Sequence, residues 1–394
     1  MKTLYNISIH FYVIGIYISS LFNAKAKEWL RGRKIIFTSL EKAINNHNNI
    51  VWFHCASLGE FEQGKPIIKA YKLKYPTHKI LLTFFSPSGF EIRKTTPLAN
   101  WVFYLPADTK SNAKKFISIV KPIKAVFIKY EFWFNYMAEL KKQNIPFYSV
   151  STIFRKEQVF FKYRWFAKQL NNVSHFFVQD QNSKELLQNI GISNCTVSGD
   201  TRFDSVLANT QNPVRVPLIE TFSKSKPTII CGSTWPEDEA LLAKYIKKNP
   251  NYNYIIAPHE LQHISALQKQ TNALLFSKAD STNIRHNNVL IIDSIGILSN
   301  IYKYGKLAYI GGGFGVGIHN ILEAVAFGLP VIFGPNYQRF NEATELINKK
   351  GAISISNYTE LTSAIDFFSA FDKSIAINYI QENSGATDTI LDQL

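Results

Sequence analysis

Cysteine is scarce in this sequence of 394 residues, which contains only three. Cys55, Cys195 and Cys231 lie far apart and form no Cys-x-x-Cys pair, so neither a disulfide framework nor a zinc ribbon is indicated. Acidic residues are also few, because 29 Asp and Glu stand against 44 Lys and Arg and leave a formal net charge of +15. The sequence therefore suits a reducing compartment and an anionic partner, which could be nucleic acid, a lipid surface or a phosphorylated substrate.

The usual signatures of phosphate-binding cofactors and metals are missing as well. The third residue after each Gly-x-Gly pair of the glycine-rich segment is never Gly, and no Lys-Ser or Lys-Thr closes that segment as a Walker A loop would require. No two aspartates are separated by a single residue, so the sequence has no Asp-x-Asp cluster to hold a metal ion across a diphosphate. The sequence thus predicts no cofactor and no metal.

An uncharged, mostly apolar run occupies Tyr5–Phe22, and a cluster of cations follows it at Lys25, Lys27, Arg31, Arg33 and Lys34. This pattern predicts a single N-terminal membrane anchor over residues 1–34, with the rest of the chain on the cytoplasmic side. Two alternatives remain: a signal peptide cleaved near Ala24-Lys25-Ala26, and a helix that lies in the membrane plane.

The rest of the chain alternates short β-rich runs with helical stretches, which predicts two doubly wound α/β domains with parallel sheets. The expected strands of the first domain are Ile50–Cys55, Lys79–Phe85, Trp101–Leu105, Ala125–Ile128, Pro146–Val150, His175–Val178 and Cys195–Ser198. Those of the second are Thr228–Cys231, Tyr254–Ala257, Val289–Ile292, Leu307–Ile310, Val331–Phe333 and Ala352–Ile355. We expect an N-terminal domain over 35–208, a linker over 209–227 and a C-terminal domain over 228–394, whose last helix could pack back on the first domain. A ligand cleft is expected between the two Rossmann-like domains.

A glycine-rich segment follows the expected strand Leu307–Ile310 and contains Gly311, Gly312, Gly313, Gly315 and Gly317. A helix is predicted to begin near Ile318, and glycine backbone beside a helix amino terminus is suited to bind phosphate. His319 and Glu323 would share one face of that helix, where the carboxylate could accept ribose hydroxyls. The alternative is a flexible turn followed by a solvated glutamate.

The order of residues in this segment resembles the nucleotide site of GT-B glycosyltransferases, and in particular the Kdo (3-deoxy-D-manno-octulosonic acid) transferases of lipopolysaccharide synthesis. The resemblance lies in the glycine cluster, His319-Asn320, Leu322-Glu323-Ala324, Gly328-Leu-Pro-Val331 and Gly334-Pro335. It implies a GT-B fold and nucleotide-binding residues at Gly232, Ser233, Thr234, Pro258, His259, Ile295, Gly296, Gly311, Gly312, Gly313, Gly317, His319, Asn320 and Glu323.

Two carboxylates are candidates for the chemistry. Ser57 and Glu60 have the spacing of a capping box, which alone would only close the first turn of a helix. The Kdo transferases have a similar Ser-x-Gly-Glu after a His-containing strand, so the resemblance implies that Glu60 is the general base. Glu131 lies in a segment similar to the family motif Glu-x-Glu-x-Trp-Pro-Asn, in which Lys129 replaces the first Glu. It could be a second catalytic carboxylate or a residue that only holds the loop.

The segment Arg155–Lys168 mixes five cations with five aromatic residues and one acid. Such a mixture suits a lipid headgroup region, although nucleic acid or a solvated surface helix would also explain it. With an anchor nearby we favour lipid over nucleic acid, and we expect Ser57, Gly59, Arg155, Lys162 and Arg164 to bind the acceptor.

The resemblance implies an inverting transferase that moves Kdo from CMP-Kdo to a lipid A precursor at the cytoplasmic face of the inner membrane. The alternatives are another GT-B enzyme, a transferase or an epimerase, acting on a UDP-sugar, and a lipid-binding protein that is not an enzyme.

Overall fold

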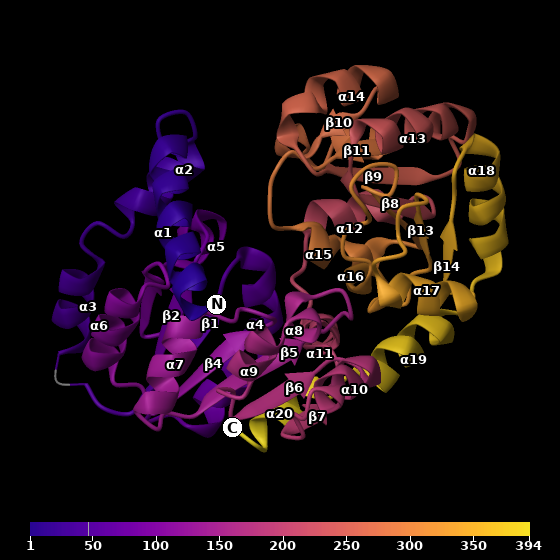
Figure 1. Cartoon of the computed structure of the whole chain (residues 1–394). Coiled ribbons are helices and arrows are strands. Elements are labelled where there is room, and N and C mark those ends of the chain that lie inside the picture. Colours follow the sequence, from indigo (N-terminus) through magenta and orange to yellow (C-terminus); the bar gives the residue numbers. More distant parts are fainter. Residues whose placement is uncertain (46) are drawn as a thin grey trace. The chain divides into compact units, whose positions relative to one another are not determined.

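The computed structural model describes residues 1–45 and 47–394. Contacts divide the chain into two compact units (Figure 1), one formed by Met1–Ser205 with Ser384–Leu394 and the other by Val206–Asn383. Each unit has its own sheet of seven strands, and every strand pair in both sheets is parallel. The two α/β domains predicted from the sequence are therefore confirmed.

The sheet of the first unit has the strand order β3-β2-β1-β4-β5-β6-β7. Its strands are β1 (Ile50–Cys55), β2 (Lys79–Phe84), β3 (Trp101–Tyr104), β4 (Lys124–Ile128), β5 (Phe147–Thr152), β6 (His175–Val178) and β7 (Cys195–Val197). Every residue of β1 is buried, as expected for a strand covered on both faces. Two apolar clusters, one on each face, form the core, and they include Trp52 on one side and Phe53 on the other.

The helices of this unit include one from the C-terminal segment. They are α1 (Lys2–Ser19), α2 (Ala24–Arg31), α3 (Ile36–Ile44), α4 (Leu58–Lys74), α5 (Pro87–Arg93), α6 (Lys110–Val120), α7 (Phe134–Lys142), α8 (Val159–Lys162), α9 (Arg164–Leu170), α10 (Gln181–Asn189), α11 (Thr201–Gln211) and α20 (Ala386–Leu391). The last helix, α20, packs against α4, and Asp204 accepts hydrogen bonds from Gly385 and Thr387.

The second unit has the strand order β10-β11-β9-β8-β12-β13-β14. Its strands are β8 (Thr228–Thr234), β9 (Asn253–Pro258), β10 (Leu274–Leu275), β11 (Val289–Ile291), β12 (Leu307–Ile310), β13 (Val331–Phe333) and β14 (Ala352–Ser354). The short edge strand β10 was not predicted. The α-helices are α12 (Pro217–Ser223), α13 (Pro236–Lys248), α14 (Ile264–Thr271), α15 (Leu298–Ile301), α16 (Leu322–Val325), α17 (Asn341–Asn348), α18 (Tyr358–Phe367) and α19 (Lys373–Asn383), and the 3₁₀ helices are Leu261–His263, Phe276–Lys278, Asn283–His286, Tyr302–Tyr304 and Phe368–Ala370.

The strand order in each sheet reverses direction beside its first strand. The chain moves outward from β1 to β2 and β3, and then returns to place β4 on the other side of β1. The second sheet repeats this arrangement with β8 and β12. At such a switch point the loops after two neighbouring strands lead away in opposite directions, and ligands of open α/β sheets bind there.

The expected linker and anchor differ from the observed structure. Residues 209–227 include the end of α11 and all of α12, because Pro217 can start a helix and Ile219 and Phe222 are buried. Residues 1–34 pack on the first unit, since the Tyr5 hydroxyl donates to Asp108 at 2.6 Å. In the part of the chain that the structure describes, no helix has both the length and the apolar character required to cross a bilayer. The predicted spanning anchor is therefore unconfirmed.

Helix α1 has two apolar faces. Tyr5, Ile9 and Val13 face the protein or are partly covered, and Ile9 is buried. The opposite face carries Leu4, Ile7, Phe11, Ile14 and Ile18, all exposed and spaced three or four residues apart. This spacing forms one continuous stripe along the helix. Here it is called the α1 stripe.

Candidate active site

The candidate carboxylates Glu60 and Glu131 follow β1 and β4, the two strands at the switch point of the first sheet. Glu60 lies in the first turn of α4, where one of its oxygens, Oε2, accepts the backbone N–H of Ala56 and of Ser57, the latter at 3.2 Å. The capping box predicted from the sequence is thus present. Because capping uses one oxygen of Glu60, it does not conflict with a chemical role for the carboxylate.

Burial shifts the titration of this pair. It raises the pKa of Glu60, an effect opposed by the Ala56 N–H and by the positive charge of Lys129. Burial, followed by the negative charge of Glu60, raises the pKa of Glu131 from 4.5 to about 8. Two neighbouring buried carboxylates cannot both ionise cheaply. Near neutral pH, Glu131 therefore keeps its proton.

His54 at the end of β1 contacts this pair and was not among the predicted site residues. Its Nδ1 lies 3.1 Å from the carbonyl oxygen of Thr83, which can only accept, so Nδ1 carries the proton. Complete burial lowers the pKa of His54 to about 3, and its unprotonated Nε2 lies 3.9 Å from Glu131 Oε2. A neutral imidazole thus faces the protonated carboxyl group of Glu131. The sequence signal for His54 was its place in the strand that precedes the Ser57–Glu60 segment.

Lys129 begins the turn that carries Glu131, and it adopts a left-handed backbone with φ of 63°. This conformation is uncommon for a side chain without special turn chemistry and has to be held by its surroundings. The Lys129 carbonyl accepts hydrogen bonds from the hydroxyls of Ser149 and Thr152, both at 3.0 Å. These two buried hydroxyls of β5 fix the turn, and with it the position of Glu131.

The other predicted acceptor residues lie on the surface of the same unit. Gly59 is exposed, and a Cβ added there would meet no atom within 4 Å. Arg155, Lys162 and Arg164 are exposed, as expected. Most of the aromatic residues between them instead pack against the core, namely Phe160, Phe161, Trp165 and Phe166. Of the rings in this segment only Tyr163 is exposed, so the segment presents cations rather than a layer of aromatic rings.

In the second unit, the segments Gly232–Thr234 and Gly311–Gly317 follow β8 and β12 at the switch point of that sheet. Their glycines allow backbones to touch. A Cβ on Gly311 would lie 2.3 Å from the Ser233 carbonyl oxygen, and one on Gly313 would lie 2.6 Å from the Gly334 nitrogen. Gly312 and Gly317 have positive φ values of 92° and 125°. Four of the glycines are therefore required by the turn itself.

The helix after this turn begins later than predicted. It covers only Leu322–Val325, and the Asn320 side chain accepts the backbone N–H of Leu322 at 3.1 Å. The His319 N–H instead bonds to the Gly311 carbonyl at 3.2 Å, so the chain returns to its starting strand before the helix starts. His319 is therefore outside the helix and Glu323 is in its first turn. The prediction that both share a helix face was wrong.

Three rings from different loops stack beside the glycine turn. Trp235 Nε1 donates to His319 Nε2 at 3.0 Å, and the Trp235 and His259 rings lie 4.8 Å apart in a stacked arrangement. Burial, with a smaller contribution from His259, lowers the pKa of His319 to about 4, so the imidazole is neutral. The structure thus brings together the predicted residues His259 and His319 and adds Trp235, whose indole was not predicted to take part.

Asp238 fixes the glycine turn from the next helix. Its buried carboxylate accepts the backbone N–H of Gly312 and of Trp235, both at 2.9 Å, and the Tyr309 hydroxyl at 2.7 Å. From the sequence alone, Asp238 is only one of the acids in the first turn of a helix. The remaining predicted residues lie at the same carboxyl edge: Pro258 ends β9, while Ile295, which is 89% exposed, and Gly296 follow β11.

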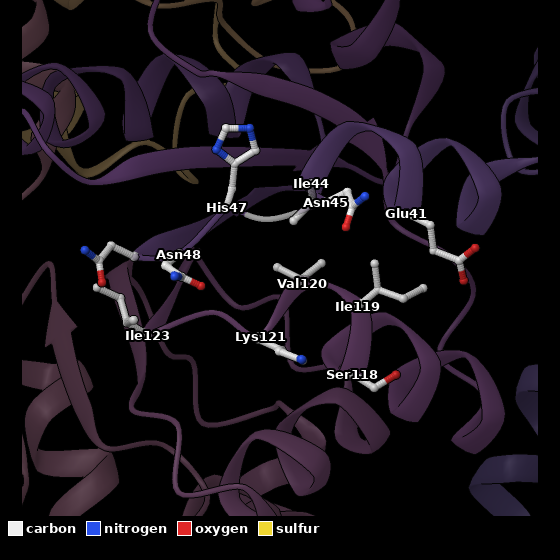
Figure 2. A pocket seen from close by; sticks show the side chains of 11 residues that line it. Glu41, Ile44, Asn45, His47, Asn48, Ser118, Ile119, Val120, Lys121 and Ile123 are labelled. Carbon is white, nitrogen blue, oxygen red and sulfur yellow. The ribbon is translucent and has the colours of Figure 1, made fainter.

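A hollow of about 680 Å³ lies at the amino ends of the strands of the first sheet (Figure 2). Its lining includes His47, Asn48 and Lys121, which precede the amino ends of β1 and β4, so it is remote from the carboxylate pair. Among the residues described, no group of three His, Cys, Asp or Glu side chains is arranged to hold a metal ion.

Comparison with known proteins gives a consistent family. Residues 31–205 match the model of the 3-deoxy-D-manno-octulosonic-acid transferase (kdotransferase) domain. A 3-deoxy-D-manno-octulosonic acid transferase of Rickettsia bellii (strain RML369-C) is 28% identical over 388 residues, which cover 95% of this chain and 91% of that protein. The enzyme of the same name from Aquifex aeolicus (strain VF5) is 26% identical and covers 86% of this chain and 91% of its own. The first domain thus matches the Kdo transferase model, and most of the chain is similar to 3-deoxy-D-manno-octulosonic acid transferases.

Solved structures support the same fold. UDP-GlcNAc 2-epimerase from Neisseria meningitidis, bound to UDP-GlcNAc, aligns with a TM-score of 0.61 and 15% identity over 87% of this chain and 98% of that one. MurG from Acinetobacter baumannii aligns with a TM-score of 0.53 and 11% identity over 88% and 99%. At such identities the likeness shows the GT-B fold alone. The glycosyltransferase predicted from the sequence motifs is supported by the sequence relatives and not by this likeness of fold.

The packing of the glycine turn predicts unequal effects of two alanine substitutions in one loop. Gly313→Ala should destabilise the second domain by about 2 kcal/mol, because its Cβ would overlap backbone atoms that cannot move aside. Gly315→Ala is the control, since its nearest neighbour would lie at 3.9 Å. Urea denaturation of both variants measures the difference, and equal stabilities would contradict this account of the turn.

The raised pKa of Glu131 predicts a pH-dependent stability. Between about pH 4.5 and pH 8 the folded chain keeps a proton on Glu131 that the unfolded chain has lost, so stability falls as pH rises through this window. Glu131→Gln removes that dependence. Its stability relative to wild type should rise up to about pH 8 and then level off, as measured by denaturation at a series of pH values. The exposed Glu157→Gln is the control and should run parallel to wild type.

Proposed function

We propose that this chain transfers Kdo from CMP-Kdo to a lipid A precursor of the lipid IVA type in lipopolysaccharide core biosynthesis. The match of residues 31–205 and the similarity to 3-deoxy-D-manno-octulosonic acid transferases support the transferred sugar. The observation that carries the chemistry is the carboxylate pair at the switch point, where Oε2 of Glu60 accepts the N–H groups of Ala56 and Ser57 and Glu131 faces His54. The second oxygen of the Glu60 carboxylate is left to act as a general base for a sugar hydroxyl.

In the proposed reaction Glu60 accepts the proton of the primary hydroxyl of the acceptor glucosamine. The hydroxyl oxygen forms a bond to the anomeric carbon of Kdo as the bond between that carbon and the CMP oxygen breaks, with inversion and through an oxocarbenium-like state. CMP leaves with the bonding electron pair. Glu131, held in its turn by Ser149 and Thr152 and facing His54, would position the acceptor as a neutral hydrogen-bond donor.

The second unit would bind the donor. The backbone of Gly232–Thr234 and of Gly311–Gly317 approaches closely at the switch point, which leaves room for phosphate beside the turn. The Trp235 ring stacks on His259 and donates to His319, and aromatic rings of this kind suit a nucleobase or a ribose. Asn320 and Glu323 would complete the nucleotide contacts, with Pro258, Ile295 and Gly296 from the neighbouring loops.

The surface of the first unit supports the proposed acceptor and location. Arg155, Lys162 and Arg164 are exposed and would meet anionic groups of the acceptor, while Ser57 and Gly59 lie beside Glu60. The α1 stripe is an apolar surface with cations in the following helix, as expected for a segment that lies in a membrane interface. We place the protein at the cytoplasmic face of the inner membrane.

The assignment of Glu60 is tested by Glu60→Gln. Loss of a general base should lower kcat at least about 100-fold, because Gln can keep the cap but cannot accept the proton. Glu62→Gln is the matched control on the same helix, since Glu62 is half-exposed and pairs with Arg93. Rates are measured with CMP-Kdo and a lipid A precursor, alongside melting temperatures. Near-normal turnover of Glu60→Gln would refute the assignment.

The nucleotide is tested by thermal shift with CMP, UDP and no nucleotide. A ligand that binds only the folded state raises the melting temperature in proportion to its affinity, so CMP should stabilise the chain more than UDP does. Preference for UDP would favour an enzyme acting on a UDP-sugar. No effect of either nucleotide would favour a lipid-binding protein without catalytic function.

A further inference from the structure

A cavity of about 790 Å³ lies in the first unit between α1, α2, α3 and the loop from β3 to α6. We call it the α1–α2 pocket. Its walls are largely apolar and come from segments far apart in the sequence, with Val13 and Ile14 on α1, Leu30 on α2, Phe37 on α3 and Ala107 in the loop. A volume of this size is typical of sites that enclose a small organic ligand or part of a larger one.

Cations are the main charged groups of this cavity. Lys27, Arg31 and Lys34 line it and are exposed. Arg31 acts electrostatically on Glu91, whose ion pair is with Lys94. No acidic side chain contributes to the lining. Apolar walls beneath exposed cations are complementary to a molecule that has both a hydrocarbon chain and an anionic group.

The pocket is connected to the carboxylate pair by direct contacts. Arg33, in its lining, lies over the Trp29 ring at 3.7 Å and donates to the carbonyl oxygen of Phe85 at 2.7 Å. The Phe85 ring in turn stacks on Trp133 with centroids 4.7 Å apart. Trp133 is two residues after Glu131 in the same turn. Only Phe85 and Trp133 therefore separate the wall of the pocket from the segment that carries Glu131.

We propose that the α1–α2 pocket binds an acyl chain of the acceptor, with Lys27, Arg31 and Lys34 facing the acceptor's anionic groups. The inference rests on the proposed function, because it assigns a place to the lipid part of that substrate. The acyl chain lies between α1 and the body of the first unit, and the α1 stripe faces the bilayer from which the acyl chain is drawn. The contacts through Phe85 and Trp133 favour the acceptor over an unrelated membrane lipid, since its sugar must reach Glu60.

Filling the pocket tests the proposal. Val13→Trp and Leu30→Trp occupy its volume from two different helices, and Ile18→Trp is the control, because Ile18 lies on the α1 stripe and does not line the pocket. Both filling variants should raise KM for a tetra-acylated lipid A precursor about tenfold and leave KM for the fully deacylated disaccharide unchanged within about twofold. Melting temperatures near wild type verify folding. Unchanged KM values in an active enzyme would overturn the inference.

A binding measurement separates failure of the inference from failure of the proposed function. If wild type transfers no Kdo, the function is wrong, and the pocket can still be probed with an acceptor brominated on its acyl chains. Such a probe should quench wild-type tryptophan fluorescence, and Trp29→Phe should remove most of that quenching, since Trp29 lines the pocket. Quenching by brominated phosphatidylglycerol that the acceptor does not displace would assign the pocket to a membrane lipid and overturn the proposal.

Discussion

All strands of both sheets run parallel, and this constraint decides where every candidate functional group lies. Because parallel strands end at the same edge, the loops after them gather there, and the reversal of strand order separates only one neighbouring pair of loops in each sheet. In the first sheet that pair carries Glu60 and Glu131. In the second it carries Gly232–Thr234 and the glycine turn. The two domains, whose sequences show no repeat, thus place different groups at the switch point of the same kind of sheet.

Placing two carboxylates at one switch point imposes its own requirements. Like charges in a buried site force one group to keep its proton, and the surroundings decide which one. Glu60 has two backbone N–H donors, whereas Glu131 faces the unprotonated nitrogen of a buried histidine. The strained Lys129 backbone brings a positive charge to both. Helix capping, histidine tautomer and backbone strain together make the two carboxylates chemically unequal.

Sequence reasoning located the strands well and individual side chains less well, for physical reasons. A buried parallel strand is a short apolar run, so β1, β6, β12 and β13 were predicted with their observed bounds. Glu60 was found because capping is a local pattern. His54 and Asp238 were missed because their roles depend on residues distant in sequence, Glu131 and Gly312. The helix near Ile318 was placed too early because the glycines allow close backbone contacts within the turn and do not lead directly into a helix. Helix α1 resembled a spanning segment because it is apolar on two faces.

Arg33, which follows α2, is half-buried and forms no ion pair with a carboxylate in residues 1–45 or 47–394. Arg33 is covered by the rings of Trp29, Phe85 and Tyr104 and donates to three backbone carbonyls, and burial lowers its pKa only to about 9. The guanidinium therefore stays charged at neutral pH. Its planar fork can hold α2, β3 and the loop after β2 in one fixed arrangement, which a lysine could not do. A rigid connection of this kind keeps a constant separation between the α1–α2 pocket and the turn that carries Glu131.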